Sequence, residues 1–395
     1  MSEWKLKECC LSISDGDHLP PPKANSGIPF ITISNIDSTN HLDFKNTLFV
    51  PIEYYDKLDS IRKAQIGDII YSVVGSFGKP VLIKKNKKFA FQRHIAILRP
   101  DSSIVDSRYL YYIMLTREFY MQADSVAIGA AQRTISLTSL RNMKVKLPSL
   151  DVQQRIATIL SRYDSLIENY QKRIKLLEES AQRLYKEWFI DLRFPGHENT
   201  KIVNGVPEGW AKGILDNIAY ESGKKVDKKY RENYGCYLPI DCLPKKNLTY
   251  VEYASILLAE SSLVSFKKGD IIFGAMRPYF HKVCFAQSEG LTRTTCFVLN
   301  SRLHEYREYL LMLMFEDSTV KHATSISVGT TMPYTRWKDL KSMEILIPDK
   351  KTVVLFGKEI YKITEALQNF SSQIRHLTEA RDRLLPKLMS GEIEV

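Results

Sequence analysis

The chain has 395 residues, 44% of them hydrophobic, so it is long enough to bury a sizeable core and to divide into two domains or more. Its 56 Lys and Arg residues outnumber the 45 Asp and Glu residues and give a net charge of +11, a balance typical of proteins that bind polyanions. No stretch approaches the roughly 20 apolar residues of a membrane span, and the six cysteines lack zinc-ligand spacing, so we expect a cytoplasmic protein with reduced thiols.

Residues 1–150 are predicted to form a mixed α/β domain. Short apolar and β-branched runs predict strands over residues 28–33, 68–74, 80–83 and 94–98. A longer apolar pattern then predicts one helix over residues 107–123. The loops between these elements combine Gly, Arg, Lys, His and aromatic residues, a composition that suits contacts in a DNA groove.

A long helix is predicted after Pro148, within a segment over residues 151–195. Apolar side chains recur from Leu160 to Trp188 at alternating spacings of four and three, which is the pattern of a coiled-coil seam. The residues between them are charged or amides, so the helix has a narrow stripe to bury and needs a partner. The triplet Phe194-Pro195-Gly196 is expected to end it.

Residues 196–348 repeat the first domain. The phrase Gly-Asp-Ile-Ile begins at Gly67 and again at Gly269, and Gly129 answers to Gly329 (329 − 129 = 200). Residues 138–149 match residues 338–349 closely, whereas residues 27–31 match residues 235–240 more loosely. The repeat predicts strands over residues 270–273, 283–286 and 296–299 and a helix over residues 304–317. Because the matches keep their order, they indicate two copies of one unit.

The second long helix is predicted within residues 349–395. Its seam repeats the first position by position, except that Arg381 stands where an apolar residue is expected. Asp349 occupies the N-cap position, and Pro386 is expected to end the helix. The simplest partner for each long helix is the other one. Antiparallel pairing would make a spacer with one domain near each end, related by a pseudo-twofold axis.

The candidate DNA-contacting residues lie in corresponding loops of the two domains. Arg and Gln can fork to guanine and adenine edges, while Thr and Lys suit phosphate oxygens. The predicted set is Lys79, Arg93, His94, Gln132, Arg133, Thr134, Arg277, Tyr279, His281, Arg293, Thr294, Thr330, Thr331 and Arg336. Any one of them alone also fits a solvated surface charge or a turn. Arg93, His94 and Arg293 gain weight because they precede matching strands in both copies.

No catalytic or metal-binding constellation stands out. The sequence lacks a phosphate-binding P-loop, a G-x-G-x-x-G turn after a strand and an H-E-x-x-H motif. We therefore predict a non-catalytic DNA-recognition protein with no catalytic residue and no metal ligand. An autonomous site-specific nuclease and a coiled-coil adaptor are the alternative hypotheses.

The whole chain resembles the specificity subunits of type I restriction–modification systems. The resemblance is carried by the opening S14-DGDHLPPP and G27-IPFI, the two Gly-Asp-Ile-Ile phrases, the helix S149-LDVQQRIATILSRYDSLIENYQKRIKLLEESAQRLYKEWF-189 and the closing L384-LPKLMSGEI-393. The helix and the closing phrase are the specific parts.

The resemblance implies an α+β fold with two target-recognition domains, each reading one half of a bipartite double-stranded DNA sequence. Residues 1–150 and 196–348 would be these domains, and residues 151–195 and 349–395 the antiparallel spacer helices. It also implies two adenine methyltransferase subunits that carry S-adenosylmethionine, and restriction and translocase subunits that use ATP and Mg²⁺, with no cofactor on this chain. In that setting Arg381 indicates a contact with a partner subunit or a local shift of the apolar stripe.

Overall fold

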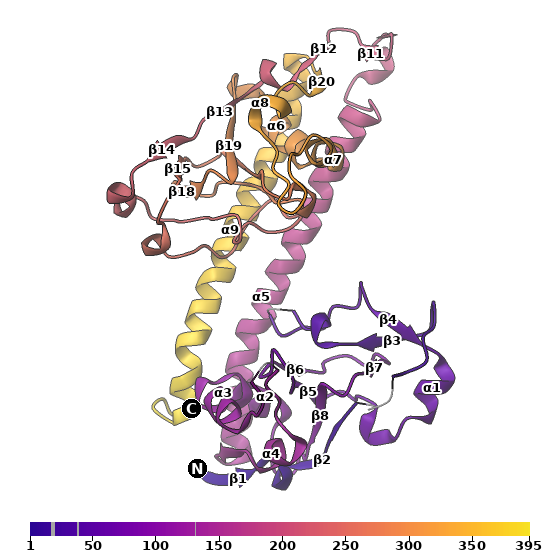
Figure 1. The fold of residues 1–395 in the computed structure, drawn as a ribbon, viewed down its shortest axis with the longest axis vertical. Helices are drawn as coiled ribbons and strands as arrows, with labels where there is room; N and C mark the ends of the chain where they lie inside the picture. The colour runs from indigo at the N-terminus through magenta and orange to yellow at the C-terminus, as the bar shows by residue number, and fades with distance from the viewer. Residues whose placement is uncertain (17–19, 38, 131) are drawn as a thin grey trace. The chain divides into compact units, whose positions relative to one another are not determined.

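The computed structural model describes residues 1–16, 20–37, 39–130 and 132–395 (Figure 1). Asp17, His18 and Leu19 of the quoted opening segment, and Ala131 of a candidate loop, lie outside the described residues. The chain divides into two compact units: unit 1 comprises Met1–Ser165 and Glu379–Val395, and unit 2 comprises Leu166–Thr378. The divisions fall inside the two long helices, so each unit combines one α/β domain with part of both helices.

Unit 1 contains nine of the named strands and four short α-helices among its described residues. The strands are β1 (Ser2–Lys5), β2 (Cys10–Asp15), β3 (Ile28–Ile31), β4 (Leu48–Val50), β5 (Ile69–Ser72), β6 (Pro80–Leu82), β7 (Ala90–Phe91), β8 (Ile95–Pro100) and β9 (Lys144–Leu147). The short helices are α1 (Ile52–Lys57), α2 (Ser107–Leu115), α3 (Arg117–Val126) and α4 (Leu137–Asn142). The first long helix, α5, follows as Leu150–Tyr185.

Unit 2 repeats the main part of this series and differs from it in its additional and missing strands. Its strands are β10 (Ile202–Val203), β11 (Val206–Pro207), β12 (Ala211–Ile214), β13 (Ala219–Glu221), β14 (Lys224–Val226), β15 (Leu263–Phe266), β16 (Ile271–Gly274), β17 (Val283–Phe285), β18 (Gly290–Arg293), β19 (Cys296–Ser301) and β20 (Glu344–Ile347). Its short helices are α6 (Arg307–Phe315), α7 (Asp317–Ser325) and α8 (Trp337–Leu340), and the second long helix, α9, is Lys350–Ser390.

The main sheet has the same strand order in both units. It runs β2-β8-β5-β6 in unit 1 and β13-β19-β16-β17 in unit 2, with every neighbouring pair antiparallel. A two-stranded sheet that joins the start of each domain to its end is also repeated, as β1-β9 and as β12-β20. The internal repeat is therefore confirmed.

The third sheet is where the two units differ. In unit 1 strand β3 pairs antiparallel with β4 and parallel with β7. In unit 2 a single residue, Tyr237, makes the same two kinds of bridge, antiparallel to Ala254 and parallel to Leu291 in β18. Unit 2 instead pairs β15 with β18, and β14 with the other side of β15. This divergence explains why residues 27–31 and 235–240 match only loosely.

The doubled Gly-Asp-Ile-Ile phrase is the turn into the central strand of each main sheet. Gly67 and Gly269 have φ values of +93° and +87°, where a side chain is disfavoured. The buried carboxylates of Asp68 and Asp270 each accept a hydrogen bond at 2.8 Å, from the backbone N–H of Gln65 and of Lys267 respectively. The phrase is thus a turn requirement and a genuine mark of duplication.

The long helices pair antiparallel within unit 2. Tyr170 on α5 contacts Phe370 on α9 with ring centroids 5.2 Å apart. Further along α5, Tyr185 contacts Phe356, nearer the start of α9, at 6.2 Å. Residue numbers rise on one helix as they fall on the other, so the predicted antiparallel pairing and seam packing of these aromatics are confirmed.

The same antiparallel direction holds within unit 1. Ile156, Ala157 and Leu160 on α5 share one apolar core with Leu385 and Leu388 on α9.

Asp349 caps the start of α9 as predicted, because its Oδ1 accepts from the N–H of Thr352 at 3.1 Å.

Two predicted helix ends are wrong. Pro386 lies inside α9, which continues to Ser390 because Leu385 and Leu388 on either side of it are buried in the core. Packing of that last turn outweighs the missing N–H of proline. The first helix turns into a π-helix over Lys186–Ile190 and ends before Pro195; the wider turn buries both Trp188 and Phe189.

The helix predicted over residues 107–123 is broken in two, whereas the one predicted over residues 304–317 corresponds to a short 3-10 turn followed by α6. Thr116 is extended, with ψ of 149°, and its hydroxyl accepts from the N–H of Phe119 and so caps α3. Glu316, also extended, separates α6 from α7 in unit 2. In unit 1 two short helices therefore stand where one continuous helix was expected, and in unit 2 α6 is followed by α7, which was not predicted. In the described part of the chain, none of the helices is long and apolar enough to cross a bilayer.

Candidate nucleic-acid interface

Three loops of unit 1 converge at one edge of its main sheet. Strand β5 pairs antiparallel with β8, with Ser72 opposite Ile95, so the end of β5 and the start of β8 meet there. Backbone hydrogen bonds then attach the neighbouring segments. The N–H of Val73 donates to the backbone carbonyl of His94 at 3.0 Å, and the N–H of Ile135 donates to the backbone carbonyl of Val73 at 2.8 Å. The N–H of Gly75 donates to Arg133 at 2.9 Å.

Unit 2 builds the same loop scaffold from different side chains. The N–H of Ala275 donates to Thr295 at 2.9 Å, that of Thr335 to Ala275 at 3.0 Å, and that of Arg277 to Pro333 at 2.7 Å. These three bonds correspond one by one to the three in unit 1. The bridges between Val74 and Thr134 and between Met276 and Tyr334 correspond as well. The backbone at this edge is therefore duplicated together with the sheet.

A cleft of about 550 Å³ opens at this edge in unit 1. It brings together four of the predicted residues, namely Arg93, His94, Gln132 and Thr134. Asp15, Val73, Val74, Ile135, Ser136 and Leu137 complete its lining. A cation, an imidazole, an amide, hydroxyls and a carboxylate around one concave surface supply donors and acceptors for nucleobase edges.

His94 contributes a neutral ring to this cleft near pH 7. Its burial, followed by the nearby positive charge of Arg93, lowers the pKa of His94 below its ordinary value of 6.5. The neutral ring offers one donor and one acceptor. Arg93 itself is exposed, so its guanidinium is available to a ligand.

Lys79 and Arg133 do not line the cleft. Lys79 is half-buried in the loop after β5, where its backbone N–H donates to the hydroxyl of Ser72 at 3.0 Å. The guanidinium of Arg133 pairs with the carboxylate of Asp124, donates to the carbonyl of Ala127 at 3.3 Å and lies 5.5 Å from the ring of Phe77. Arg133 thus stabilises the loop after α3 in this structure.

In unit 2 the corresponding loop is held in a strained conformation around Arg277. Arg277 has φ of +50° where unit 1 has Gly75 at +68°, and a residue with a side chain adopts this region at a cost. Its Nη2 donates to the carbonyl of Thr331 at 3.3 Å, while its buried Nε has no hydrogen-bond partner among the residues that the structure describes. Tyr279, two residues on, is 51% exposed at the outside of the loop.

His281 supports this loop from inside. Its side chain is buried, with Nε2 2.9 Å from the carbonyl oxygen of Phe315 and Nδ1 3.2 Å from Oδ1 of Asp317. Lys246 Nζ also pairs with Asp317, at 3.0 Å. Burial lowers the pKa of His281 against the opposing effect of the Asp317 carboxylate. Both ring nitrogens are therefore engaged within the protein.

The remaining predicted residues of unit 2 are exposed at the same edge of the sheet: Arg293, Thr294, Thr330, Thr331 and Arg336. Thr294 is tied into the scaffold, since its carbonyl accepts from the hydroxyl of Tyr334 at 3.2 Å. Arg336 forms an exposed ion pair with Asp339 at 2.6 Å. Sequence reasoning missed Asp15 and Ser136, although the alignment of Ser136 with Arg336 in the repeat was a signal for the latter.

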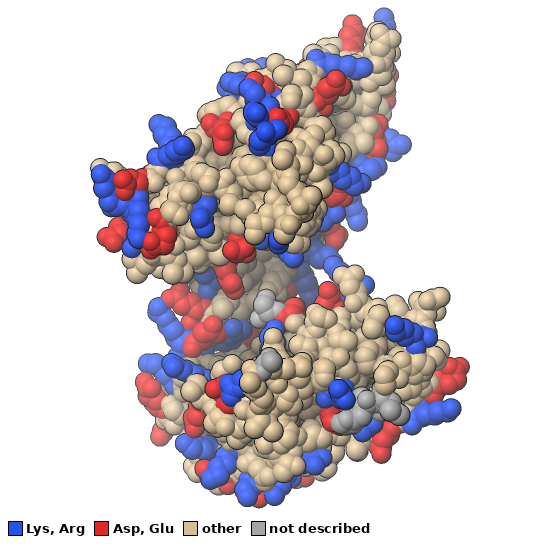
Figure 2. All heavy atoms as spheres, in the orientation of Figure 1, with Lys and Arg blue, Asp and Glu red and all other residues tan. Residues whose placement is uncertain are grey.

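Charge is mixed on the face of the molecule that Figure 2 draws. Figure 2 shows Lys and Arg interspersed with Asp and Glu on the face drawn, so the net charge of +11 does not gather into one patch there. Within the described ranges there is no group of His, Cys, Asp and Glu side chains that could hold a metal ion.

Comparison with known proteins identifies this architecture. The family model described as the type I restriction modification DNA specificity domain matches twice, over residues 5–179 and 207–380. The MjaIX specificity subunit of Methanocaldococcus jannaschii is 28% identical over 93% of this chain and 87% of its own length. The HindI specificity subunit of Haemophilus influenzae is 22% identical over 92% of this chain and 95% of its own.

A solved structure shares the fold. The S subunit of a type I restriction–modification system from M. genitalium aligns with a TM-score of 0.62 at 16% identity, over 98% of this chain and 95% of that one. The resemblance and the fold class predicted from the sequence are thereby confirmed. With two matched copies of the DNA specificity domain, this chain belongs to the type I restriction–modification specificity family.

Proposed function

We propose that each unit reads one half of a bipartite DNA target and that the paired helices set the distance between the two halves. The observation that carries this proposal is the duplicated loop scaffold, in which one set of backbone hydrogen bonds presents different side chains in each unit. A constant backbone with variable side chains suits two domains that share one docking geometry and read different bases.

The family decides between the hypotheses left open by the sequence. Specificity subunits are the DNA-recognition components of restriction–modification complexes, so this chain has a recognition role and not a catalytic one. The nuclease and adaptor hypotheses have no support from the family.

The dimensions of the helices support a spacing role. Helix α5 has 36 residues and α9 has 41, and at about 1.5 Å per residue each is on the order of 55–60 Å long. Half-sites read from one face of DNA lie about one helical turn apart, roughly 34–36 Å. Helices of this length can span such a separation.

Partner subunits supply the chemistry in this proposal. Two adenine methyltransferase subunits would bind the chain and use S-adenosylmethionine, and restriction subunits would use ATP and Mg²⁺. If the purified chain alone transferred methyl groups from S-adenosylmethionine to DNA, this division of labour would be wrong.

Single substitutions test the one-domain, one-half-site arrangement. Arg293→Ala removes an exposed cation of unit 2 and should cost about 1–3 kcal/mol of binding to one half of the target. Arg277→Gly is a second variant of unit 2. It installs the residue that unit 1 has at Gly75, so it removes the Arg277 side chain and relieves the strain of the left-handed backbone. Arg93→Ala should affect the other half. Binding to targets altered in one half at a time, in complex with the partners, is the measurement; equal losses at both halves would contradict the proposal.

The spacing role has its own test. Inserting one whole heptad after Lys175, which is exposed on α5, together with a matching heptad in α9, lengthens the pair and keeps the seam in phase. The preferred number of base pairs between half-sites should increase while both half-site sequences stay the same. Unchanged spacing would refute the role of the helices.

A further inference from the structure

The seam between the long helices contains one charged cluster, at the place where Arg381 interrupts the apolar pattern. In unit 1 the Nη1 of Arg381 on α9 donates to Oδ1 of Asp164 on α5 at 2.8 Å. The hydroxyl of Tyr112 on α2 donates to Oδ2 of Asp164 at 2.6 Å. The side chains of Arg381 and Asp164 are 25% and 14% exposed. Arg381 thus finds its partner within the chain, and the apolar stripe does not shift.

Both oxygens of Asp164 are therefore used, by two different elements. Arg381 connects α5 to α9, and Tyr112 connects α5 to the α/β domain of unit 1. A mostly buried carboxylate with two such donors is well satisfied in this arrangement and in few others.

The three aligned residues of unit 2 are uncharged. The repeat aligns Asp164 with Thr364, Arg381 with Ala181 and Tyr112 with Met312. Ala181 and Met312 are buried in the core, and the hydroxyl of Thr364 donates to its own helix, at the carbonyl of Tyr361.

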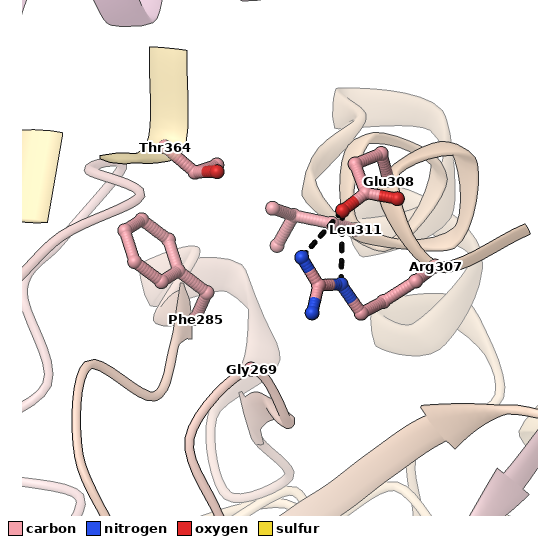
Figure 3. A pocket seen from close by; sticks show the side chains of 6 residues that line it. All are labelled: Gly269, Phe285, Arg307, Glu308, Leu311 and Thr364. Atoms are coloured by element: carbon pink, nitrogen blue, oxygen red, sulfur yellow. Dashed lines mark hydrogen bonds and ion pairs between the residues drawn. The ribbon is translucent and has the colours of Figure 1, made fainter. Parts of the chain in front are cut away.

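Thr364 lines a small cavity of about 20 Å³ beside Leu311 and Phe285 (Figure 3). The neighbouring Arg307 and Glu308, which also line this cavity, pair with each other. Every other seam position from Leu160 to Leu184 is apolar in both copies. The two copies of the seam thus differ by one ion pair.

We propose that Asp164, Arg381 and Tyr112 are positioning residues that allow α5 to pair only with α9 of the same chain and only in one register. The inference rests on the proposed function, since that register would set the distance between the half-sites. Two seams so alike could otherwise pair wrongly, because α5 could bind α5 of a second copy or the two helices could slide by one heptad.

The alternatives each leave a buried charge without a partner. In an antiparallel pair of two α5 helices, Asp164 would face Ala181 of a second copy, and in a pair of two α9 helices Arg381 would face Thr364. A slip of one heptad would place Asp164 opposite Ile374 or Leu388. An uncompensated buried charge is strongly unfavourable, whereas the correct pair satisfies it. A single polar site in an apolar seam is known to specify partner and register in this way.

The test uses the full chain with Asp164→Thr and Arg381→Ala together, which copies the chemistry of unit 2. Replacing a buried ion pair by well-packed neutral residues is often neutral for stability, so this variant should fold and bind both half-sites. Its preference for one spacer length should fall at least about tenfold, and light scattering should detect dimers that the unaltered chain does not form. Arg381→Lys keeps the charge and should keep the preference.

Asp164→Asn serves if the double variant does not fold, because it keeps the shape and removes the charge. Binding to targets with the spacer lengthened or shortened one base pair at a time is the readout, with Arg155→Ala, which removes an exposed ion pair on the same helix, as control. An unchanged spacer preference and an unchanged mass in the charge-removing variants overturn the inference. If the unaltered chain itself shows no fixed spacer, the proposed function fails instead.

Discussion

The two units share a backbone plan but stabilise their buried positions differently. Unit 1 uses ion pairs: Asp68 with Arg99 at 2.9 Å in the main sheet, and Asp164 with Arg381 in the helix seam. Unit 2 pairs the matching Asp270 with the neutral Asn300 at 2.6 Å. Duplication has preserved strand order, turns and seam spacing, while the side chains that satisfy each buried group have diverged.

The ends of the helix pair show the same divergence in their apolar contacts. In unit 2 Phe356 packs among Tyr185, Trp188 and Phe189, with the Phe189 ring 4.8 Å away. The repeat aligns Phe356, Tyr185 and Trp188 with Ile156, Leu385 and Leu388, which form the aliphatic equivalent in unit 1. Aromatic rings add edge-to-face attraction to the area that they bury, so the unit 2 end should be the more sensitive one.

The largest expected effect is the loss of that aromatic cluster. Phe356→Ala should cost about 3–5 kcal/mol of unfolding free energy, because the side chain is fully buried and the cavity cannot collapse among rigid rings. Ile156→Val, at the matching position of unit 1, should cost only about 0.5–1.5 kcal/mol. Urea unfolding followed by circular dichroism measures both. Lys358→Ala, exposed on α9, is the control and should stay within about 0.5 kcal/mol.

The buried aspartates that begin the central strands should differ as well. Asp68→Asn leaves the half-buried Arg99 without its carboxylate and should cost about 3–5 kcal/mol. Asp270→Asn keeps a neutral partner in Asn300 and should cost about 1–2 kcal/mol. Thermal unfolding of the two variants compares them directly. Equal losses would mean that the turn contact to Gln65 or Lys267, and not the cross-strand partner, decides the stability.

Unit 2 should also respond to pH through Glu178 on α5. Burial raises the pKa of this carboxyl to about 7, against the backbone N–H of Leu248, which donates to it at 2.7 Å. Since the folded pKa lies above the ordinary 4.5, the folded state holds the proton more tightly, and stability falls as pH rises from about 4.5 through 7. Over this pH range the free energy of unfolding falls by about 3 kcal/mol in total.

Glu178→Gln should remove this slope and leave unit 2 more stable at pH 8. Unfolding free energies in urea between pH 5 and 8 measure it, followed by tryptophan fluorescence because Trp188, Trp210 and Trp337 all lie in unit 2. Glu179→Gln, whose side chain is 43% exposed, should leave the slope intact. A pH dependence that persists in the Glu178 variant would locate its origin elsewhere.

The features that were predicted correctly from the sequence are ones that recur in both copies. The strands, the Gly-Asp turns and the antiparallel seam all depend on local periodicity, and the repeat supplied a second observation of each. The helix break at Thr116 was not predictable in this way, because the apolar pattern continues through it and tertiary packing changes the direction of the chain. Pro386 shows the reverse, since a strong local stop signal yields to the burial of Leu385 and Leu388.

The candidate site was predictable as a set of loops but not residue by residue. Arg93, His94, Gln132 and Thr134 share one cleft because the antiparallel pairing of β5 and β8 brings their loops together. Arg133 is as basic and as near in sequence, yet it turns toward Asp124 on α3. His281 is engaged with Phe315 and Asp317, contacts of high sequence separation that no local pattern reports.

The smallest expected effect concerns the N-caps of α4 and α8. Ser136 caps α4 by accepting from the N–H of Ser139, whereas the aligned Arg336 makes no cap and only an exposed ion pair with Asp339. Arg336→Ser should therefore stabilise unit 2 by about 0.5–1 kcal/mol, the worth of a cap less a surface ion pair. Ser136→Arg should destabilise unit 1 by about 1 kcal/mol.

Because Arg336 costs stability as an N-cap residue, we expect it to have a role other than folding. Ser136 lines the cleft of unit 1, so the aligned Arg336 lies at the same edge of the sheet in unit 2. If Arg336 contacts a DNA phosphate, Arg336→Ser should weaken binding to all sequences alike and reduce the dependence of log affinity on log salt by about one. Thermal melting and salt titration of this one variant would then show opposite effects. The free energy of unfolding would rise, and the affinity for DNA would fall. A gain in stability with an unchanged salt dependence would show that Arg336 is a surface residue without a capping role and that unit 2 binds DNA without it.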